Sequence, residues 1–287
     1  APKILAMSLV VTHFEPSTKG KLWYGNHILK QIKHELRLLV PKSGILESEI
    51  IHYPKSGENS DCSDSNVVHI DSFLYDDDDL ETLCDLGQLH RYRCRDCGSN
   101  NIETMIFLSH SASFEDLLYV FCDLLPDLKG MKILDVGSRL GCVLYGVCYI
   151  SSRFINIHEL FKAYVFSNAP KIIGIEMNQD FCQIQETIIA KYNMQDRIEI
   201  RQGLITEFED VVGSSDVFIF NNVFEFFVDR TQEAKIWRFL FQNIKSGSLL
   251  VTRPALSKSF DELDLDVDDY VIPIEPNNSA VLEEKEL

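Results

Sequence analysis

In the second half of the chain, short apolar runs alternate with longer segments in which apolar residues recur every three or four positions. The short runs predict five strands, at Lys132–Val136, Lys171–Ile175, Arg197–Arg201, Asp216–Asn221 and Ser248–Thr252. The longer segments predict three helices, at Gly141–Ser151, Gln179–Tyr192 and Thr231–Ile244. Strands and helices in alternation are typical of α/β folds, so we expect a Rossmann-like, mostly parallel sheet with helices on both faces.

The first half of the chain has a mixed pattern. Apolar residues at helical spacing predict a helix over Ile28–Val40, and the polar segment Ser56–Asn66 predicts a loop. Val67–Leu74 is a candidate strand, and Leu80–Leu89 is a candidate helix that follows the acidic block Asp76–Asp79. We therefore expect an N-terminal α+β extension.

These patterns divide the chain into three regions. We expect an α+β region at 1–128 that shapes the site of a second ligand, and the α/β domain at 129–260. An acidic C-terminal segment follows at 261–287, with one candidate strand at Asp269–Glu275.

Composition narrows the class of protein. The chain has 287 residues, of which 45% are hydrophobic, so it can bury a sizeable core. Its formal net charge of −17 disfavours nucleic acid as a partner, because phosphate binding depends on clustered Lys and Arg. No apolar run is long enough to cross a bilayer, and Ile4–Val11 is too short for a secretory signal. We expect a cytoplasmic or nuclear protein.

A glycine-bearing turn follows the first of the five strands, in Leu134-Asp135-Val136-Gly137-Ser138-Arg139-Leu140-Gly141. Such a turn between a strand and a helix lets the backbone approach a ligand and points free N–H groups at it. The third glycine of the dinucleotide fingerprint is absent, which disfavours a nicotinamide-dependent oxidoreductase.

An acidic residue closes the second strand, in Gly174-Ile175-Glu176-Met177-Asn178. A carboxylate at this place can accept hydrogen bonds from both hydroxyls of a ribose. Together with the glycine turn, Glu176 predicts a site for a nucleoside.

With these two segments and Asp216-Val217-Phe218-Ile219-Phe220-Asn221-Asn222-Val223-Phe224-Glu225, the region from Met131 to Pro254 resembles the class I S-adenosylmethionine-dependent methyltransferases. The resemblance implies that S-adenosylmethionine is the cofactor, with Asp135 and Gly137 beside its methionine part and Glu176 on its ribose. It also implies that Asn221 and Asn222 face the methyl group and the acceptor. The expected cofactor-binding residues are Asp135, Gly137, Ser138, Arg139, Gly141, Glu176, Met177 and Asn221, and the expected acceptor-positioning residues are Asn221, Asn222 and Glu225.

The chain departs from the family pattern at two places. Gln202-Gly203-Leu204 stands where the family often has an acid near the adenine. The family's closing strand hairpin is represented by Asp269–Glu275 alone, so the sheet is either one strand short or takes a strand from the N-terminal half.

The methyl acceptor is less constrained. We expect a protein side chain or a small molecule, and a catalytically inactive sensor or partner subunit is the first alternative. A second alternative is an RNA amino-group methyltransferase, because Asn221-Asn222-Val223-Phe224 resembles the Asn-Pro-Pro-aromatic box of that class with both prolines missing.

A short cysteine motif lies in the N-terminal half. Cys94 and Cys97 have the spacing of half a zinc site, but no second pair follows, so two free thiols are the competing interpretation. The nearby Arg91, Arg93 and Arg95 could contact an anion, or form salt bridges with the many acids of the chain.

Overall fold

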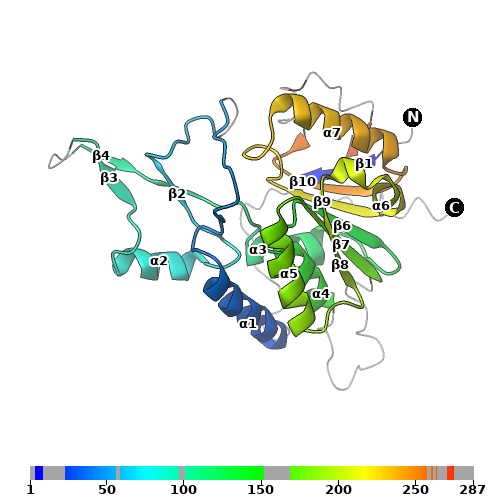
Figure 1. Cartoon of the computed structure of the whole chain (residues 1–287), viewed down its shortest axis with the longest axis horizontal. Helices are drawn as coiled ribbons and strands as arrows, with labels where there is room; N and C mark the ends of the chain where they lie inside the picture. Colours follow the sequence, from blue (N-terminus) through cyan, green and yellow to red (C-terminus); the bar gives the residue numbers. More distant parts are fainter. Residues whose placement is uncertain are drawn as a thin grey trace.

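The computed structural model describes residues 4–8, 23–55, 59–96, 101–151, 169–256, 260, 263 and 270–274. Its centre is a seven-stranded sheet in which every neighbouring pair is parallel (Figure 1). In spatial order the strands are β11 (Val271–Pro273), β1 (Ile4–Ser8), β10 (Leu249–Arg253), β9 (Val217–Asn221), β6 (Lys132–Val136), β7 (Lys171–Glu176) and β8 (Ile198–Gln202). The predicted Rossmann-like α/β fold is confirmed, and all five predicted strands lie within one residue of their expected ends.

The strand β1 comes from the N-terminal half of the chain and lies inside the sheet. Leu5 pairs with Leu249 of β10 on one side and with Ile272 of β11 on the other. Of the two alternatives left by the sequence, the sheet therefore takes a strand from the N-terminal half. Ile4–Val11 carried no strand prediction, because a short apolar run without flanking turns is ambiguous.

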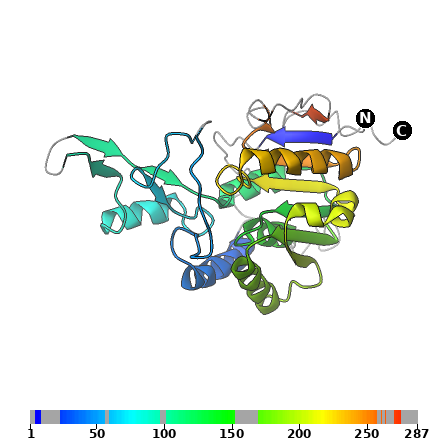
Figure 2. The same ribbon diagram turned by 45° about the horizontal axis from the view of Figure 1, so that its top comes forward.

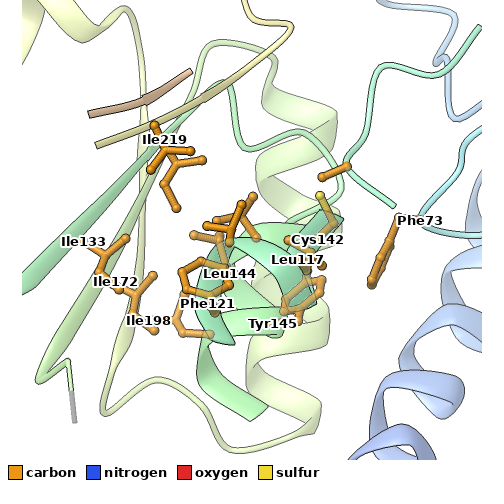
Figure 3. Close-up of a cluster of buried hydrophobic side chains, with 14 of the residues drawn as sticks. Phe73, Leu117, Phe121, Ile133, Cys142, Leu144, Tyr145, Ile172, Ile198 and Ile219 are labelled. Atoms are coloured by element: carbon orange, nitrogen blue, oxygen red, sulfur yellow. The ribbon is translucent and has the colours of Figure 1, made fainter. Parts of the chain in front are cut away.

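Successive residues of the strands point to opposite faces, and each face packs against its own helices. Ile133, Ile172 and Ile219 face α4 (Cys142–Ser151) and α5 (Gln179–Lys191) (Figure 3). On the opposite face, Leu134 and Phe218 belong to the cluster formed with α6 (Glu209–Ser214) and α7 (Arg230–Asn243). Further helix bounds are α1 Trp23–Leu39, α2 Asp77–Asp85 and α3 Phe114–Tyr119, with a π-helical turn at Val120–Leu124 and a 3₁₀ turn at Ile205–Glu207.

The N-terminal extension projects beside the carboxyl edge of the sheet (Figures 1 and 2). It contains α2, a parallel pair of strands β2 (Val67–His69) and β5 (Ile106–Leu108), and an antiparallel pair β3 (Tyr92–Cys94) and β4 (Ile102–Thr104). The helix α1 is also part of the N-terminal half, but it packs beside α4 and adds Leu29, Ile32 and Leu36 to the core of the sheet domain.

The acidic block of the extension has a structural role. The Asp76 side chain accepts a hydrogen bond from the backbone N–H of Asp79 at 3.0 Å, which caps the first turn of α2. Negative charge is stabilised at this end of a helix by the free N–H groups and the backbone dipole. The block therefore begins a helix, three residues earlier than the start expected at Leu80.

All three arginines near the cysteine motif form ion pairs, and Arg91 pairs with Glu81 at 3.9 Å. Arg93 and Arg95 both contact Glu103 on the neighbouring strand, at 2.6 and 3.0 Å. These contacts agree with the salt-bridge interpretation of the arginine cluster.

Candidate functional site

A cavity of about 300 Å³ lies at the carboxyl ends of the central strands, where parallel α/β sheets commonly bind ligands. The strands β6, β7, β8 and β9 end at this edge and place Gly137, Glu176, Gly203 and Asn221 in the lining of the cavity. The remaining wall comes from the N-terminal extension. The lining residues are Ser48, Glu49, Ile50, His52, Val136, Gly137, Arg139, Ile175, Glu176, Met177, Asn178, Gly203, Leu204, Ile205, Asn221, Asn222, Val223, Phe224, Phe227, Val228 and Ile236.

The turn after β6 has the conformation that its glycines suggest. Gly137 has φ +71°, and a Cβ atom there would lie 3.1 Å from Cγ1 of Val223. Arg139 also has a positive φ, of 45°, which is uncommon for a residue with a side chain. The turn thus brings bare backbone to the cavity at Gly137, and it places a strained arginine two residues later.

Glu176 lies at the end of β7 and is only 5% exposed. Its two carboxylate oxygens accept hydrogen bonds from the backbone N–H groups of Arg139 and Asn178, both at 2.8 Å. Burial raises the pKa of Glu176, and the N–H groups of Asn178 and Arg139 oppose that shift. The side chain is therefore fixed at the cavity wall, and each oxygen keeps a lone pair for a ligand.

Several polar atoms near this edge have no partner among the described residues. They include Oδ2 of Asp135, Oδ1 of Asn221 and Oγ1 of Thr252. Asp135 is 2% exposed, and burial, followed by the negative charge of Glu176, raises its pKa well above the usual range. Of these three residues only Asn221 lines the cavity, and because buried polar groups normally find partners, its unpaired acceptor favours a ligand that brings a donor.

Arg139 reaches from the turn to the N-terminal extension. Its guanidinium pairs with the Glu49 carboxylate and donates to the carbonyl oxygen of Gly44 at 2.8 Å. The rings of Phe181 and Phe227 lie 4.9 and 5.1 Å from the guanidinium carbon. The pair is almost completely buried, with side-chain exposures of 9% and 6%.

The last residue of β9 and the segment after it hold the three residues expected to position an acceptor. Asn221 and Asn222 line the cavity, and Asn222 has φ 52°, a left-handed conformation that asparagine tolerates well. Glu225 lies outside the lining, and both of its oxygens accept hydrogen bonds from the Asn59 amide, at 3.0 and 2.9 Å.

Contacts with the extension hold both sides of the cavity. Ser48 donates to Asp180 at 2.6 Å, next to the start of α5, and the backbone N–H of His52 donates to the carbonyl of Phe226 at 2.9 Å. Residues 44–52 therefore run across the carboxyl edge from β7 to the segment after β9. We call them the strap.

Behind the segment after β9 the extension contributes a buried aromatic cluster. His110 stacks on His69 with ring centroids 5.3 Å apart, and it meets the edges of Phe226 and Phe227. Burial, with the nearby positive charge of Arg139 as the second cause, lowers the pKa of His110 to about 3, so the ring is neutral near pH 7. The cluster fixes the cavity wall that Phe227 forms.

The predicted cofactor residues divide into two groups. Gly137, Arg139, Glu176, Met177 and Asn221 line the cavity. Asp135, Ser138 and Gly141 stand behind it in the described structure: Ser138 donates to Gln185 at 2.9 Å, and Gly141, with φ +78°, directly precedes α4.

The strap residues Ser48, Glu49, Ile50 and His52 were not predicted from the sequence. They lie in a segment without a recognisable motif, so no signal in the sequence would have placed them at the cavity.

The zinc prediction is not decided. Cys94 is exposed and its Sγ donates to the carbonyl oxygen of Asp96 at 2.8 Å, and Cys97 lies outside the described residues. Within the described ranges, no group of three or more His, Cys, Asp or Glu side chains is arranged to hold a metal ion. None of the helices in these ranges combines the length and apolar character that crossing a bilayer requires.

The fold and the cavity together define a Rossmann-like α/β protein with a cavity at the carboxyl edge of its sheet. No protein-family model matches the sequence, and no curated protein matches it either.

Three solved structures illustrate the likeness. The precorrin-8w decarboxylase of Methanobacterium thermoautotrophicum is 16% identical with a TM-score of 0.37, over 54% of this chain and 70% of that chain. An S-adenosylmethionine-dependent O-methyltransferase of Thermotoga maritima is 15% identical with a TM-score of 0.37, over 55% and 51%. The precorrin-6y C5,15-methyltransferase of Geobacter metallireducens is 12% identical with a TM-score of 0.38, over 54% and 72%. At such identities the activity of this chain has to be argued from its own site.

Proposed function

We propose that this protein is an S-adenosylmethionine-dependent methyltransferase that acts on a protein side chain or a small molecule. The observation that carries the proposal is the position of Glu176, a buried carboxylate fixed at the wall of a cavity that opens on the carboxyl edge of a parallel sheet. A carboxylate at the end of the second strand of the α/β domain is suited to bind both hydroxyls of a ribose.

The other walls suit the remaining parts of a nucleoside. Gly137 permits close approach of a ligand to the backbone, and Oδ1 of Asn221 is an acceptor without a partner in the described structure. Met177 and Leu204 are exposed apolar side chains on the lining, at 54% and 36%, and they offer a surface for a planar base. The residues present therefore fit the cofactor that the sequence resemblance implies.

The reaction asks little of the protein's own side chains. When bound, S-adenosylmethionine supplies a methyl group already activated by the sulfonium. The chain needs to hold the acceptor in line with that group and to keep water out, which alone can account for much of a rate enhancement. Asn221 and Asn222 are placed at the cavity to orient an acceptor, and Phe224 and Phe227 supply apolar walls.

Calorimetric titration with S-adenosylmethionine tests the proposal. We expect binding in the micromolar range, on the order of −8 kcal/mol, and loss of most of it in Glu176→Ala. The matched control is Glu186→Ala, an exposed glutamate on α5 that should bind like the unsubstituted protein. If the protein melts cooperatively but does not bind S-adenosylmethionine, the proposal is wrong. Binding of NAD instead would favour an oxidoreductase.

A non-catalytic sensor or partner subunit is the second candidate. It is favoured by Gln202-Gly203-Leu204, where the acid of active family members is often found, and by the N–H of Leu204, which already donates to Glu207 at 2.7 Å. Incubation with methyl-labelled cofactor and pools of small molecules, proteins and RNA separates the candidates. Label in a protein or small molecule supports the enzyme, label in RNA supports the amino-group alternative, and bound cofactor without any labelled product supports the sensor.

A further inference from the structure

The outer edge of β8 is open in the part of the chain that the structure describes. β8 is the last strand of the seven-stranded sheet, at the end opposite β11, and no described strand pairs with its outer side (Figure 1). An open edge presents a row of backbone donors and acceptors, which can pair with a strand of another chain.

The backbone groups along β8 alternate between the two sides of the strand. The carbonyl of Arg197, just before β8, accepts from the N–H of Ile172 on β7 at 2.8 Å. The N–H of Gly203, just after β8, donates to the carbonyl of Glu176 on β7 at 3.0 Å. Every second residue between these two therefore bonds to β7, and the others face the open side. The residues that face the open side are Ile198, Ile200 and Gln202.

Most of the backbone groups on the open side remain available. The N–H of Ile198 is used, because it donates to the carbonyl of Met194 in the preceding turn at 2.9 Å. The N–H groups of Ile200 and Gln202 have no partner in the described structure. Ile200 is half-buried and Gln202 is exposed, so a second strand can reach this edge.

The side chains of β8 do not protect the edge in the usual ways. Proteins often block an edge strand with a proline or with charges of one sign, and β11 at the other end of the sheet carries Pro273. β8 has no proline, and its charges Glu199 and Arg201 have opposite signs. Glu199 contacts Lys171 and Arg201 of its own chain at 2.7 and 2.5 Å, and its side chain stays 29% exposed beside 48% for Arg201. The edge is therefore open and carries both signs of charge.

We propose that this edge binds the same edge of a second copy of the chain, with the two β8 strands antiparallel about a two-fold axis at Ile200. Ile200 then faces Ile200 of the partner subunit, and the two residues exchange both of their backbone hydrogen bonds. The N–H of Gln202 donates to the carbonyl of Ile198 of the partner subunit, and the symmetric bond forms as well. The two sheets continue into one another across the axis.

Charge complementarity selects a second copy as the partner and fixes the register. With the axis at Ile200, Glu199 faces Arg201 of the partner subunit, and Arg201 faces Glu199 of the partner subunit, so both cross-strand pairs are attractive. With the axis one residue earlier, Glu199 would face Glu199 of the partner subunit, and like charges directly opposite destabilise a strand pair.

The net charge of −17 on each copy opposes association at long range. Salt at about 0.15 M screens charges over about 8 Å, so it weakens this long-range repulsion more than the contacts between adjacent strands. The strand pair alone buries less than the roughly 800 Å² per partner of a standard interface, so we expect a weak, reversible dimer.

Sedimentation velocity of the full chain without added ligand tests the proposal. We expect a dimer that dissociates on dilution, with a dissociation constant on the order of 10 µM. Arg201→Glu and Glu199→Arg are made separately, and each places like charges opposite one another in a dimer of identical copies. The matched control is Arg238→Glu, which makes the same change of charge at an exposed arginine on α7, away from β8 (Figure 1).

Each of the two β8 variants should dimerise about tenfold or more weakly than the unsubstituted protein. An equal mixture of the two should form a heterodimer, because every position 199 then faces a position 201 of opposite charge. Arg238→Glu should dimerise like the unsubstituted protein, and circular dichroism checks that all variants are folded.

Three results would overturn the proposal. The unsubstituted protein could stay monomeric up to concentrations about tenfold above the expected dissociation constant. Its dimer could persist unchanged in Arg201→Glu, which would place the interface elsewhere. The two folded β8 variants could also remain monomeric when mixed, which would exclude this register.

Discussion

The carboxylate of Glu176 accepts a hydrogen bond from the backbone N–H of Arg139 at 2.8 Å, which ties the end of β7 to the turn after β6. A second bond, from the N–H of Asn178, holds the other oxygen. The same side chain thus supports the turn and faces the cavity, and substitutions of it affect both the fold and the ligand.

Glu176→Gln is expected to separate these two roles. The amide keeps one acceptor oxygen but turns an NH₂ group toward a backbone N–H, so we expect a loss of about 1–3 kcal/mol in the free energy of unfolding. The affinity for S-adenosylmethionine should fall about tenfold or more, because a charged acceptor for the ribose is lost. Denaturant unfolding and calorimetry measure the two effects. Native stability together with native affinity would show that the carboxylate has neither role.

Gly137→Ala tests the close approach at the turn. An added Cβ would meet Val223 at 3.1 Å, in a backbone conformation with φ +71°. Gly130 has φ +77° and nothing within 4 Å of its Cβ position, so Gly130→Ala carries the backbone strain alone, about 1–2 kcal/mol.

Comparison of the two variants isolates the crowding. We expect Gly137→Ala to lose more stability than Gly130→Ala and to lose ligand binding as well, as measured by thermal unfolding and titration. Val223→Ala in the Gly137→Ala background should recover part of the stability. Equal effects of the two glycine substitutions would mean that the space at Gly137 is unimportant.

The sequence predicted the strands β6 and β7 well because they are buried on both faces. Each strand has a run of apolar residues at its centre, Ile133-Leu134 in β6 and Ile172-Ile173 in β7, so the signal does not depend on knowing the neighbouring strands. The same local character placed Gly137 and Glu176 at the strand ends. The local sequence pattern therefore predicted the sheet domain and the side of its cavity that the strand ends form.

The strap and β1 could not be predicted in the same way. Glu49 is an acid in an ordinary polar segment, and it becomes part of the site only through its contact with Arg139, 90 residues further on. β1 belongs to the sheet through its pairing with β10 and β11. Both features depend on long-range pairing, which no short window of the sequence contains.

Leu5→Ala tests whether β1 is an integral strand. Leu5 is 4% exposed and packs in the core between the sheet and its helices, so truncation should cost about 2–4 kcal/mol. Ile272→Ala on the neighbouring β11 is the control, because that side chain is 39% exposed and its truncation should cost less than about 1 kcal/mol. Denaturant unfolding measures both. Similar small losses would place the first strand outside the cooperative fold.

Asp135→Asn makes a prediction about pH. Burial, and then the charge of Glu176, raises the pKa of Asp135 in the folded protein above its value in the unfolded chain. The stabilising contribution of this group is therefore complete below the pKa of the unfolded chain, and it is lost as the pH rises through the raised value. Asparagine stays neutral throughout. As the pH increases, the melting temperature of Asp135→Asn should therefore rise relative to that of the unsubstituted protein.

Calorimetric melting of the ligand-free protein between about pH 5 and 8 measures this difference. Asp196→Asn, which changes an exposed aspartate, is the control and should run parallel to the unsubstituted protein. Parallel curves for Asp135→Asn as well would mean that Asp135 stays ionised in the fold. Its free oxygen would then be a permanent buried charge, which only a cationic partner or a solvating environment could stabilise.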